Sequence, residues 1–200
     1  MNVTMTDIKK LREMTGAGLS DCKKALAESE DMDGAVAYLR KKGQAVAAKR
    51  SDREAAEGCV LVKAVDGFGA IIALKCETDF VANNADFVAL TQEILDAAVA
   101  NKCKTLDEVK ALPMGDGTVA DAVTARSGIT GEKMELDGYS YIESDNICTY
   151  NHMNRNGLCA MVALSAPVAD ETVGKNVAMQ IASASPVAID ESGVPQEVKD

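Results

Sequence analysis

Apolar residues in the first fifty positions recur every three to four residues, which predicts three short helices. Thr6 is expected to cap the first helix, and the Thr-Gly-Ala-Gly sequence at 15–18 to form the turn into the second, which covers about 19–28. The third helix is expected to stop near Gly43. The inner faces of these helices are formed by Ile8, Leu11 and Met14, by Leu19, Cys22 and Leu26, and by Met32, Val36 and Leu39.

The spacing of apolar residues changes after the third helix. Residues 44–57 are rich in alanine and lack a strong apolar face, so we expect a helical linker there. Residues 59–65 and 70–76 are apolar runs of strand length, and the Asp-Gly-Phe-Gly sequence between them predicts a hairpin. The chain therefore passes from an all-helical part into a part that contains a sheet.

Helices and strands continue to the end of the chain. The aliphatic stretches 70–74 and 160–164 match in pattern, and each is followed by an acidic residue and a helix. This favours an α+β fold in which two related subdomains each combine a small antiparallel sheet with helices. The further predicted helices cover 85–100, 106–111, 119–125 and 171–182, and the further predicted strands cover 135–142, 147–152 and 158–164.

This order of elements divides the chain into three parts. Residues 1–54 are expected to form a three-helix docking module with its linker, residues 55–134 a first subdomain and residues 135–200 a second one. The last residues, 194–200, have the pattern of a helix start with an early proline. Because a one-turn helix is marginal by itself, we expect the sequence to be cut from a longer protein.

The composition is that of a soluble globular chain. Of the 200 residues 47% are hydrophobic and 26% charged, and a net charge of −10 argues against nucleic-acid binding, which needs clustered Lys and Arg. The N-terminal 55 residues carry a net charge of +2 and the remainder −12. The chain shows no signal peptide, no uncharged run of membrane-spanning length and no framework spacing of its six cysteines, so we expect a cytoplasmic protein.

The sequence shows no motif for covalent chemistry. It contains no phosphate-binding loop, dinucleotide fingerprint or nucleophile elbow, so we expect neither an enzyme nor a bound cofactor. The single histidine, His152, lies between Cys148 and Cys159, and these residues could supply metal ligands or a Cys–His pair. A Cys/His redox or zinc-dependent enzyme is therefore the alternative function, although a buried thiol and a polar imidazole at a strand edge explain the same residues.

Two segments are unusual without being catalytic. Residues 15–26 combine a glycine-containing turn with an amphipathic helix, and residues 76–83 place a large aromatic residue beside a carboxylate where a strand ends. Phe80 is either a core residue, seven positions before Phe87, or an exposed aromatic residue of the kind that dominates protein–protein interfaces. The pattern of residues leaves both alternatives open.

These segments resemble the bacterial translation elongation factor Ts family, and the resemblance covers essentially the whole chain. It implies a guanine-nucleotide exchange factor that promotes GDP release from elongation factor Tu and performs no covalent chemistry itself. It also implies that the N-terminal module is similar to ubiquitin-associated domains and docks on the GTPase domain. The matching motifs are Leu-Arg-Glu at 11–13, Thr-Gly-Ala-Gly at 15–18, Asp-Cys-Lys-Lys-Ala-Leu at 21–26, Glu-Thr-Asp-Phe-Val at 77–81 and Ala-Met-Gln-Ile-Ala at 178–182.

The resemblance further implies which residues contact the partner, in its GDP-bound and nucleotide-free forms. Thr78, Asp79, Phe80 and Val81 form a loop that enters the GTPase domain, where the aromatic ring disturbs the Mg²⁺ and phosphate contacts that hold GDP. Neither a nucleic acid nor a membrane is expected as a direct partner. Additional partner contacts are implied at Arg12, Leu19, Ser20, Arg50 and His152.

The chain also departs from the family pattern. Leu-Ser at 19–20 replaces a frequent Met-Met pair, and Asn176 and Gln180 stand where a histidine is frequent. The coiled-coil insertion and C-terminal module of longer family members do not appear before Asp200. A homodimer is therefore an open alternative for the longer protein, not an expectation for these 200 residues.

Overall fold

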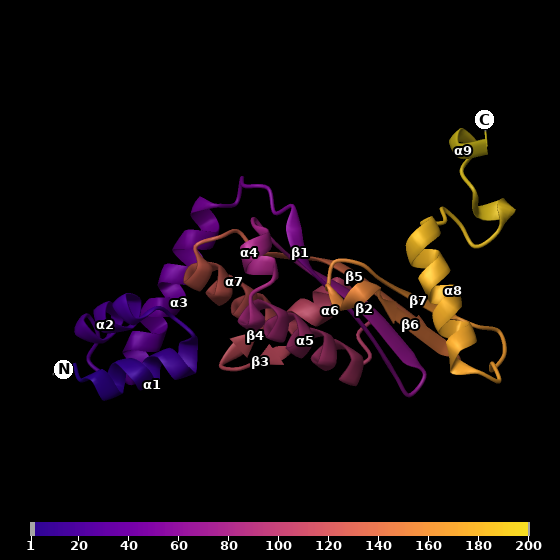
Figure 1. Cartoon of the computed structure of the whole chain (residues 1–200). Helices are drawn as coiled ribbons and strands as arrows, with labels where there is room; N and C mark the ends of the chain where they lie inside the picture. Colours follow the sequence, from indigo (N-terminus) through magenta and orange to yellow (C-terminus); the bar gives the residue numbers. More distant parts are fainter. Residues whose placement is uncertain (1–2, 200) are drawn as a thin grey trace.

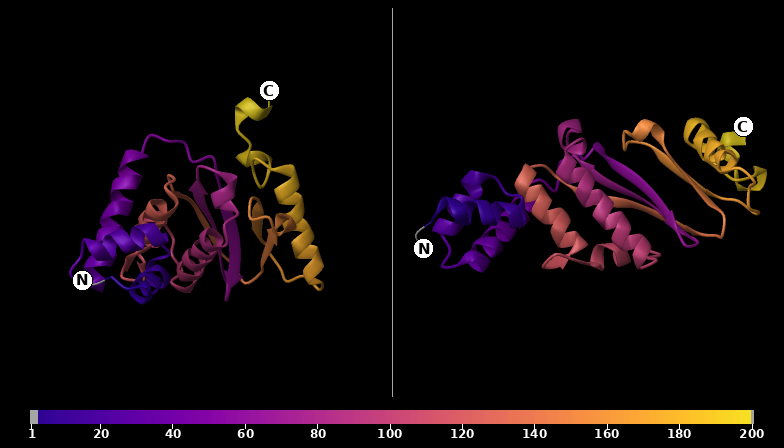
Figure 2. Two further views of the ribbon diagram at one scale, coloured as in Figure 1. Left: turned by 60° about the vertical axis from the view of Figure 1, so that its left-hand side comes forward. Right: turned by 60° about the horizontal axis from the view of Figure 1, so that its bottom comes forward.

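The computed structural model describes residues 3–199 and arranges their elements in a row (Figure 1). Three helices form the N-terminal end, a three-stranded sheet with its helices forms the middle, and a hairpin with one long helix lies toward the C-terminal end (Figure 2). The predicted α+β class, with N-terminal helices followed by small antiparallel sheets backed by helices, is confirmed. No helix among the described residues is long and apolar enough to cross a membrane.

The N-terminal module consists of three helices, α1 (Met5–Thr15), α2 (Leu19–Ala27) and α3 (Met32–Lys49). Helix α1 is capped by Thr4 and not, as predicted, by Thr6. The Thr4 hydroxyl accepts a hydrogen bond from the Asp7 amide, and the Asp7 carboxylate accepts one from the Thr4 amide, which completes a capping box. The interior of the module is filled by small and aliphatic side chains, those of Ile8, Leu11, Ala17, Cys22, Ala25, Leu26 and Ala35.

Helix α3 does not stop near Gly43, so that prediction was wrong. The first residues of the expected linker, 44–49, form the C-terminal end of α3 instead. The physical reason is a close helix crossing with α7 (Val119–Thr130). A Cβ atom added to Gly128 would lie 2.3 Å from the Cα of Gly43, so the two backbones approach without intervening side chains. Gly43 is therefore a contact residue inside the helix, not its terminator.

The middle of the molecule is an antiparallel sheet in the order β1-β2-β5, formed by β1 (Glu57–Val65), β2 (Phe68–Cys76) and β5 (Glu135–Glu143). The predicted hairpin between the first two strands is present, but its turn has two residues instead of four. Asp66 and Gly67 both have positive φ, 49° and 76°, which is the type I′ turn that matches the twist of paired strands.

Strand β5 was expected in the second subdomain, and the structure adds it to the sheet of the first two strands. It pairs with β2, with Phe68 opposite Glu143 and Lys75 opposite Glu135. Strand β2 is an almost uninterrupted apolar run with no residue fully exposed, which is typical of a central strand that needs partners on both edges. The Phe68 ring stacks on that of Tyr141 with centroids 5.6 Å apart, so the strand pair also shares side-chain packing.

Helix α5 (Ala85–Ala100) covers one face of this sheet, and α6 (Leu106–Ala111) follows it; both have the predicted bounds. Helix α7 begins where predicted but continues five residues further, to a left-handed Gly131. The main core lies between α5 and the sheet. Its largest fully buried side chains include Phe68, Ile72, Leu74, Phe87, Ile94 and Leu95.

The C-terminal unit consists of a two-stranded hairpin, β6 (Ile147–Asn151) and β7 (Cys159–Ala163), and helix α8 (Glu171–Ala184). The hairpin packs on the sheet face opposite α5, where a Cβ atom added to Gly69 would lie 3.1 Å from Ile147 and 3.4 Å from Met161. Strand β6 ends one residue earlier than predicted because His152 begins a 3₁₀ turn. The short elements are α4 (Asp79–Ala82), β3 (Pro113–Met114), β4 (Gly117–Thr118), two 3₁₀ turns (His152–Asn154 and Glu191–Gly193) and α9 (Gln196–Lys199).

Candidate functional site

The Thr-Asp-Phe-Val segment forms a single capped helical turn, α4, directly after β2. Thr78 is its N-cap, and the Thr78 hydroxyl accepts a hydrogen bond from the Val81 amide at 3.4 Å. At the other end, the Asn83 side-chain amide donates to the Asp79 carbonyl at 2.8 Å. Both ends of the turn are therefore closed by side chains, although it contains only four helical residues.

Phe80 projects from this turn into solvent. Its side chain is 86% exposed. Its neighbours Val81 and Ala82 face the other way, because Ala82 is buried in the main core and Val81 packs against it. Of the two alternatives for Phe80, the core residue is wrong and the exposed aromatic is confirmed.

The base of the turn is held by Glu132, at the connection between α7 and β5. One carboxylate oxygen of Glu132 accepts hydrogen bonds from the backbone amides of Glu77 at 3.2 Å and Thr78 at 3.1 Å. The other accepts one from the Thr78 hydroxyl at 2.7 Å. Three donors at the start of the turn are thus satisfied by one side chain from more than fifty positions away.

Glu77 makes the opposite connection. Its carboxylate accepts a hydrogen bond from the Lys133 amide at 2.6 Å and pairs with the Arg50 guanidinium at 2.8 Å. These bonds, first the one from Lys133 and then the one from Arg50, hold the pKa of the Glu77 carboxyl below its usual value. Arg50 caps the end of α3 and was predicted to contact a partner, but here its guanidinium binds Glu77 of the same chain.

Two other predicted contact residues, Arg12 and Leu19, lie together on the N-terminal module. They line a shallow hollow with Asp86 from the first turn of α5. The Arg126 guanidinium of α7 lies 3.4 Å from the Asp86 carboxylate and also lies close to the turn at Gly16. Arg126 therefore connects α5 to the module. Asp86 follows the end of α4 by four residues. Ser20 is exposed beside Leu19. The hollow is lined by Met5, Lys9, Arg12, Glu13, Gly16, Leu19 and Asp86.

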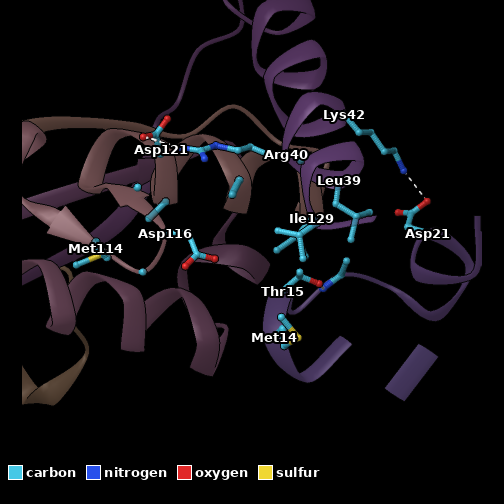
Figure 3. Close-up of a pocket in the computed structure, with 17 residues that line it drawn as sticks. Met14, Thr15, Asp21, Leu39, Arg40, Lys42, Met114, Asp116, Asp121 and Ile129 are labelled. Atoms are coloured by element: carbon cyan, nitrogen blue, oxygen red, sulfur yellow. Dashed lines mark hydrogen bonds and ion pairs between the residues drawn. The ribbon is translucent and has the colours of Figure 1, made fainter. Parts of the chain in front are cut away.

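A cavity of about 250 Å³ lies at the junction of the module with α7 and the β3–β4 turn (Figure 3). Four of its charged groups form ion pairs within the chain, Arg40 with Asp121 at 2.9 Å and Lys42 with Asp21, and Asp116 also lines it. Hydrogen bonds from Thr118, and then Arg40, hold the pKa of Asp121 below its usual value. These ion pairs hold the module against α7 and within itself at the junction.

His152 lies apart from this group, at the end of β6. It is exposed, and its Nδ1 atom lies 2.9 Å from the Tyr150 hydroxyl. None of its described hydrogen bonds or ring contacts reaches residues 78–81. Of the predicted contact residues, the structure thus joins Thr78–Val81 with Arg50 through Glu77, places Arg12 and Leu19 together, and leaves His152 separate.

The residues of the alternative enzyme do not form a reactive centre. Burial raises the pKa of the Cys159 thiol to about 11, so the thiol stays protonated at neutral pH and is a poor nucleophile or ligand. The Cys148 sulfur packs against Gly174 of α8. Among the described residues, no group of three or more His, Cys, Asp or Glu side chains could hold a metal ion.

Glu132 was missed from the sequence, and Glu77 appeared only as part of a motif without a role. No local pattern could have predicted the hydrogen bonds between these two segments, because residues 77–78 and 132–133 lie more than fifty positions apart in the sequence. The one available sign was that Glu132 follows Gly131, a glycine that ends a helix pattern.

Comparison with known proteins finds one family model and several relatives that match this chain. A family model described as Elongation factor TS matches residues 77–200. The protein named Elongation factor Ts from Bacteroides fragilis is 71% identical over 200 residues, which is all of this chain and 60% of the relative. Proteins of the same name from Bacteroides thetaiotaomicron and Porphyromonas gingivalis are 68% and 52% identical over all of this chain, covering 61% and 73% of their own lengths. The chain thus spans about 60% of the length of the first two.

Proposed function

The chain belongs to the elongation factor Ts family, and from this premise we propose that it promotes GDP release from the GTPase elongation factor Tu during translation. Because the chain is shorter than its relatives, the proposal concerns what these 200 residues can do. The observation that carries it is Phe80, an aromatic side chain 86% exposed on a turn whose base is fixed. In this proposal the chain forms and breaks no covalent bond.

An exposed phenylalanine is unfavourable in water, and it becomes favourable when a partner pocket removes it from solvent. Aromatic side chains of this kind act as anchors in protein–protein interfaces. On the GTPase, an inserted ring displaces the groups that hold Mg²⁺ and the phosphates of GDP. If the chain binds the nucleotide-free GTPase more tightly than the GDP-bound form, linkage requires that it lowers GDP affinity by the same factor.

The N-terminal module supplies a second contact in this proposal. Arg12 and Leu19 combine a cation with an exposed apolar side chain, and Ser20 lies beside them. The charge distribution supports a protein partner over a nucleic acid, because residues 56–200 carry a net charge of −12. Arg50 contributes through Glu77, and His152 would touch the partner independently of the Phe80 turn.

The proposal is tested by stopped-flow release of fluorescent GDP from elongation factor Tu. Phe80→Ala should slow the accelerated release at least about 30-fold, because truncating an interface anchor costs roughly 2 kcal/mol or more. The melting temperature should hardly change, since the ring leaves no cavity. Ile189→Ala is the matched control, because it also removes a fully exposed apolar side chain, and it should leave release and melting unchanged.

Two results would contradict the proposal. The first is a Phe80→Ala variant that accelerates release as well as the wild type does. The second is a wild-type chain that binds the GTPase without changing the rate of GDP release at any concentration.

A further inference from the structure

We infer that Glu132 is the positioning residue of the Phe80 turn, an assignment that rests on the proposed function and deepens it. Its carboxylate accepts all three donors that open the turn, the amides of Glu77 and Thr78 and the Thr78 hydroxyl, at 2.7 to 3.2 Å. The described hydrogen bonds of the Glu132 carboxylate are made with Glu77 and Thr78 and not with Phe80. Glu132 acts through Thr78, the N-cap.

The arrangement is reciprocal, and we call it the carboxylate clasp, formed by Glu77, Thr78, Glu132 and Lys133. The Glu132 side chain binds the backbone at 77–78, and the Glu77 side chain binds the backbone amide of Lys133 at 2.6 Å. Hydrogen bonds to a charged acceptor are stronger than neutral ones. Each of the two connections therefore fixes the other.

The turn depends on such support for two reasons. The amides of Glu77 and Thr78 leave the sheet after β2 ends, and the half-buried backbone there needs acceptors. A helical turn of four residues is too short to be stable by itself. The direction of Phe80 is consequently set by what holds the residues before it.

The clasp is anchored to the rest of the molecule through α7. The Glu132 amide donates to the Thr130 hydroxyl at 3.2 Å, and the Ser127 hydroxyl donates to the Glu132 carbonyl. Helix α7 in turn crosses α3 of the N-terminal module at Gly43 and Gly128. Glu132 therefore fixes the Phe80 turn relative to α7, and α7 packs against the N-terminal module. The distance between Phe80 and the proposed contact residues Arg12 and Leu19 is thereby held constant.

The test compares Glu132→Ala, Glu132→Gln and Glu135→Ala in the full chain. The glutamine oxygen can accept from both amides while its NH₂ group donates to the Thr78 hydroxyl, so this variant should preserve the clasp. Glu135 is three positions away and exposed. It pairs with the Lys133 ammonium at 3.4 Å, whereas the clasp uses the Lys133 backbone amide, so Glu135 is the matched control for loss of a carboxylate. Should the alanine variant fail to fold, Glu132→Asp, one methylene shorter, takes its place.

Two readouts are needed, amide hydrogen exchange by NMR and release of fluorescent GDP. In Glu132→Ala the amides of Glu77, Thr78 and Val81 should exchange at least about tenfold faster, while those of the α5 core stay protected. Accelerated GDP release should fall by about tenfold or more, remain within about threefold of wild type in Glu132→Gln, and be unchanged in Glu135→Ala.

Unchanged exchange of these amides in Glu132→Ala would overturn the assignment, and so would normal GDP release from a variant whose turn has loosened. The proposed function fails separately. If neither wild type nor Phe80→Ala accelerates release, that function is refuted, and the amide exchange still decides whether Glu132 holds the turn.

Discussion

The two sheet-and-helix units carry the same aliphatic pattern, at 70–74 and 160–164, yet they bury it to different extents. In the first unit, β2 lies between two strands under α5, and Ile72 and Leu74 are fully buried. In the second, β7 belongs to a two-stranded hairpin, and α8 exposes Val173 and Val177. A shared pattern predicts the same element type, whereas the number of strands and helices around it decides how much apolar surface is buried.

The segments that follow the two strands differ in the same way. After β2, the turn at residues 78–81 is tied to a distant connection by Glu132. After β7, the described caps of α8 are local, as in the Asp170 carboxylate that accepts from the Thr172 amide at 2.8 Å. A site that must hold an exposed aromatic ring in one direction needs support of the first kind, which here comes from the connection between α7 and β5.

The contrast in burial predicts the largest effect. Phe87→Ala in α5 should lower the free energy of unfolding by about 3–5 kcal/mol, because it leaves a cavity in a fully buried core. Val177→Ala in α8 should change it by no more than about 0.5 kcal/mol, because the side chain is exposed. Urea denaturation followed by circular dichroism measures both, and similar losses for the two variants would show that α8 packs as tightly as α5.

Much of the fold could be predicted from the sequence where the determinants are local. Helices α5 and α6 have the predicted bounds because Asn84 and Thr105 cap strong apolar patterns. The end of α3 and the partner of β5 could not be predicted, since the causes lie far along the chain, at Gly128 and at β2. Periodicity reports which face is apolar, and it does not report what covers that face.

The candidate site shows the same limit. The turn at residues 78–81 was found through its resemblance to a family motif, but an aromatic residue before a helix fits both a core and an exposed position. Only the packing of Ala82 decides that Phe80 points outward. Glu132 was beyond prediction, because hydrogen bonds across fifty positions leave no periodic trace. The division into residues 1–54, 55–134 and 135–200 stays a prediction about folding units, with β5 paired outside its expected unit.

The helix crossing at Gly128 sharpens the comparison at an intermediate size. Gly128→Ala should destabilise the chain by about 1–3 kcal/mol, because its new carbon would lie 2.3 Å from the Gly43 Cα and must push α3 and α7 apart. Gly157→Ala in the second unit is the control, with no atom within 4 Å of the added carbon, and should be neutral within about 0.5 kcal/mol. Thermal and urea unfolding test this, and a neutral Gly128→Ala would mean that the crossing is loose.

The smallest effect is a pH dependence at the clasp, for which Glu77→Gln is the variant. The pKa of Glu77 is lowered in the folded chain by Lys133 and Arg50, so its stabilisation is fully present above the unfolded pKa of about 4.3 and is lost as the pH falls through the lower folded value. At pH 6 the variant should be less stable by about 1.5 kcal/mol, the low end for a hydrogen bond to a charged group, because Arg50 is partly exposed.

The stability difference between wild type and Glu77→Gln should therefore be constant from pH 7 to 5 and shrink below pH 4, as measured by urea denaturation at each pH. Asp170→Asn is the matched change in the second unit, where hydrogen bonds from Thr172 also lower the pKa of the carboxyl. It should show the same sign with a smaller amplitude, since this carboxylate caps its own helix and joins no distant segments. A stability difference for Glu77→Gln that persists unchanged at pH 3 would show that the charge of the Glu77 carboxylate does not stabilise the clasp.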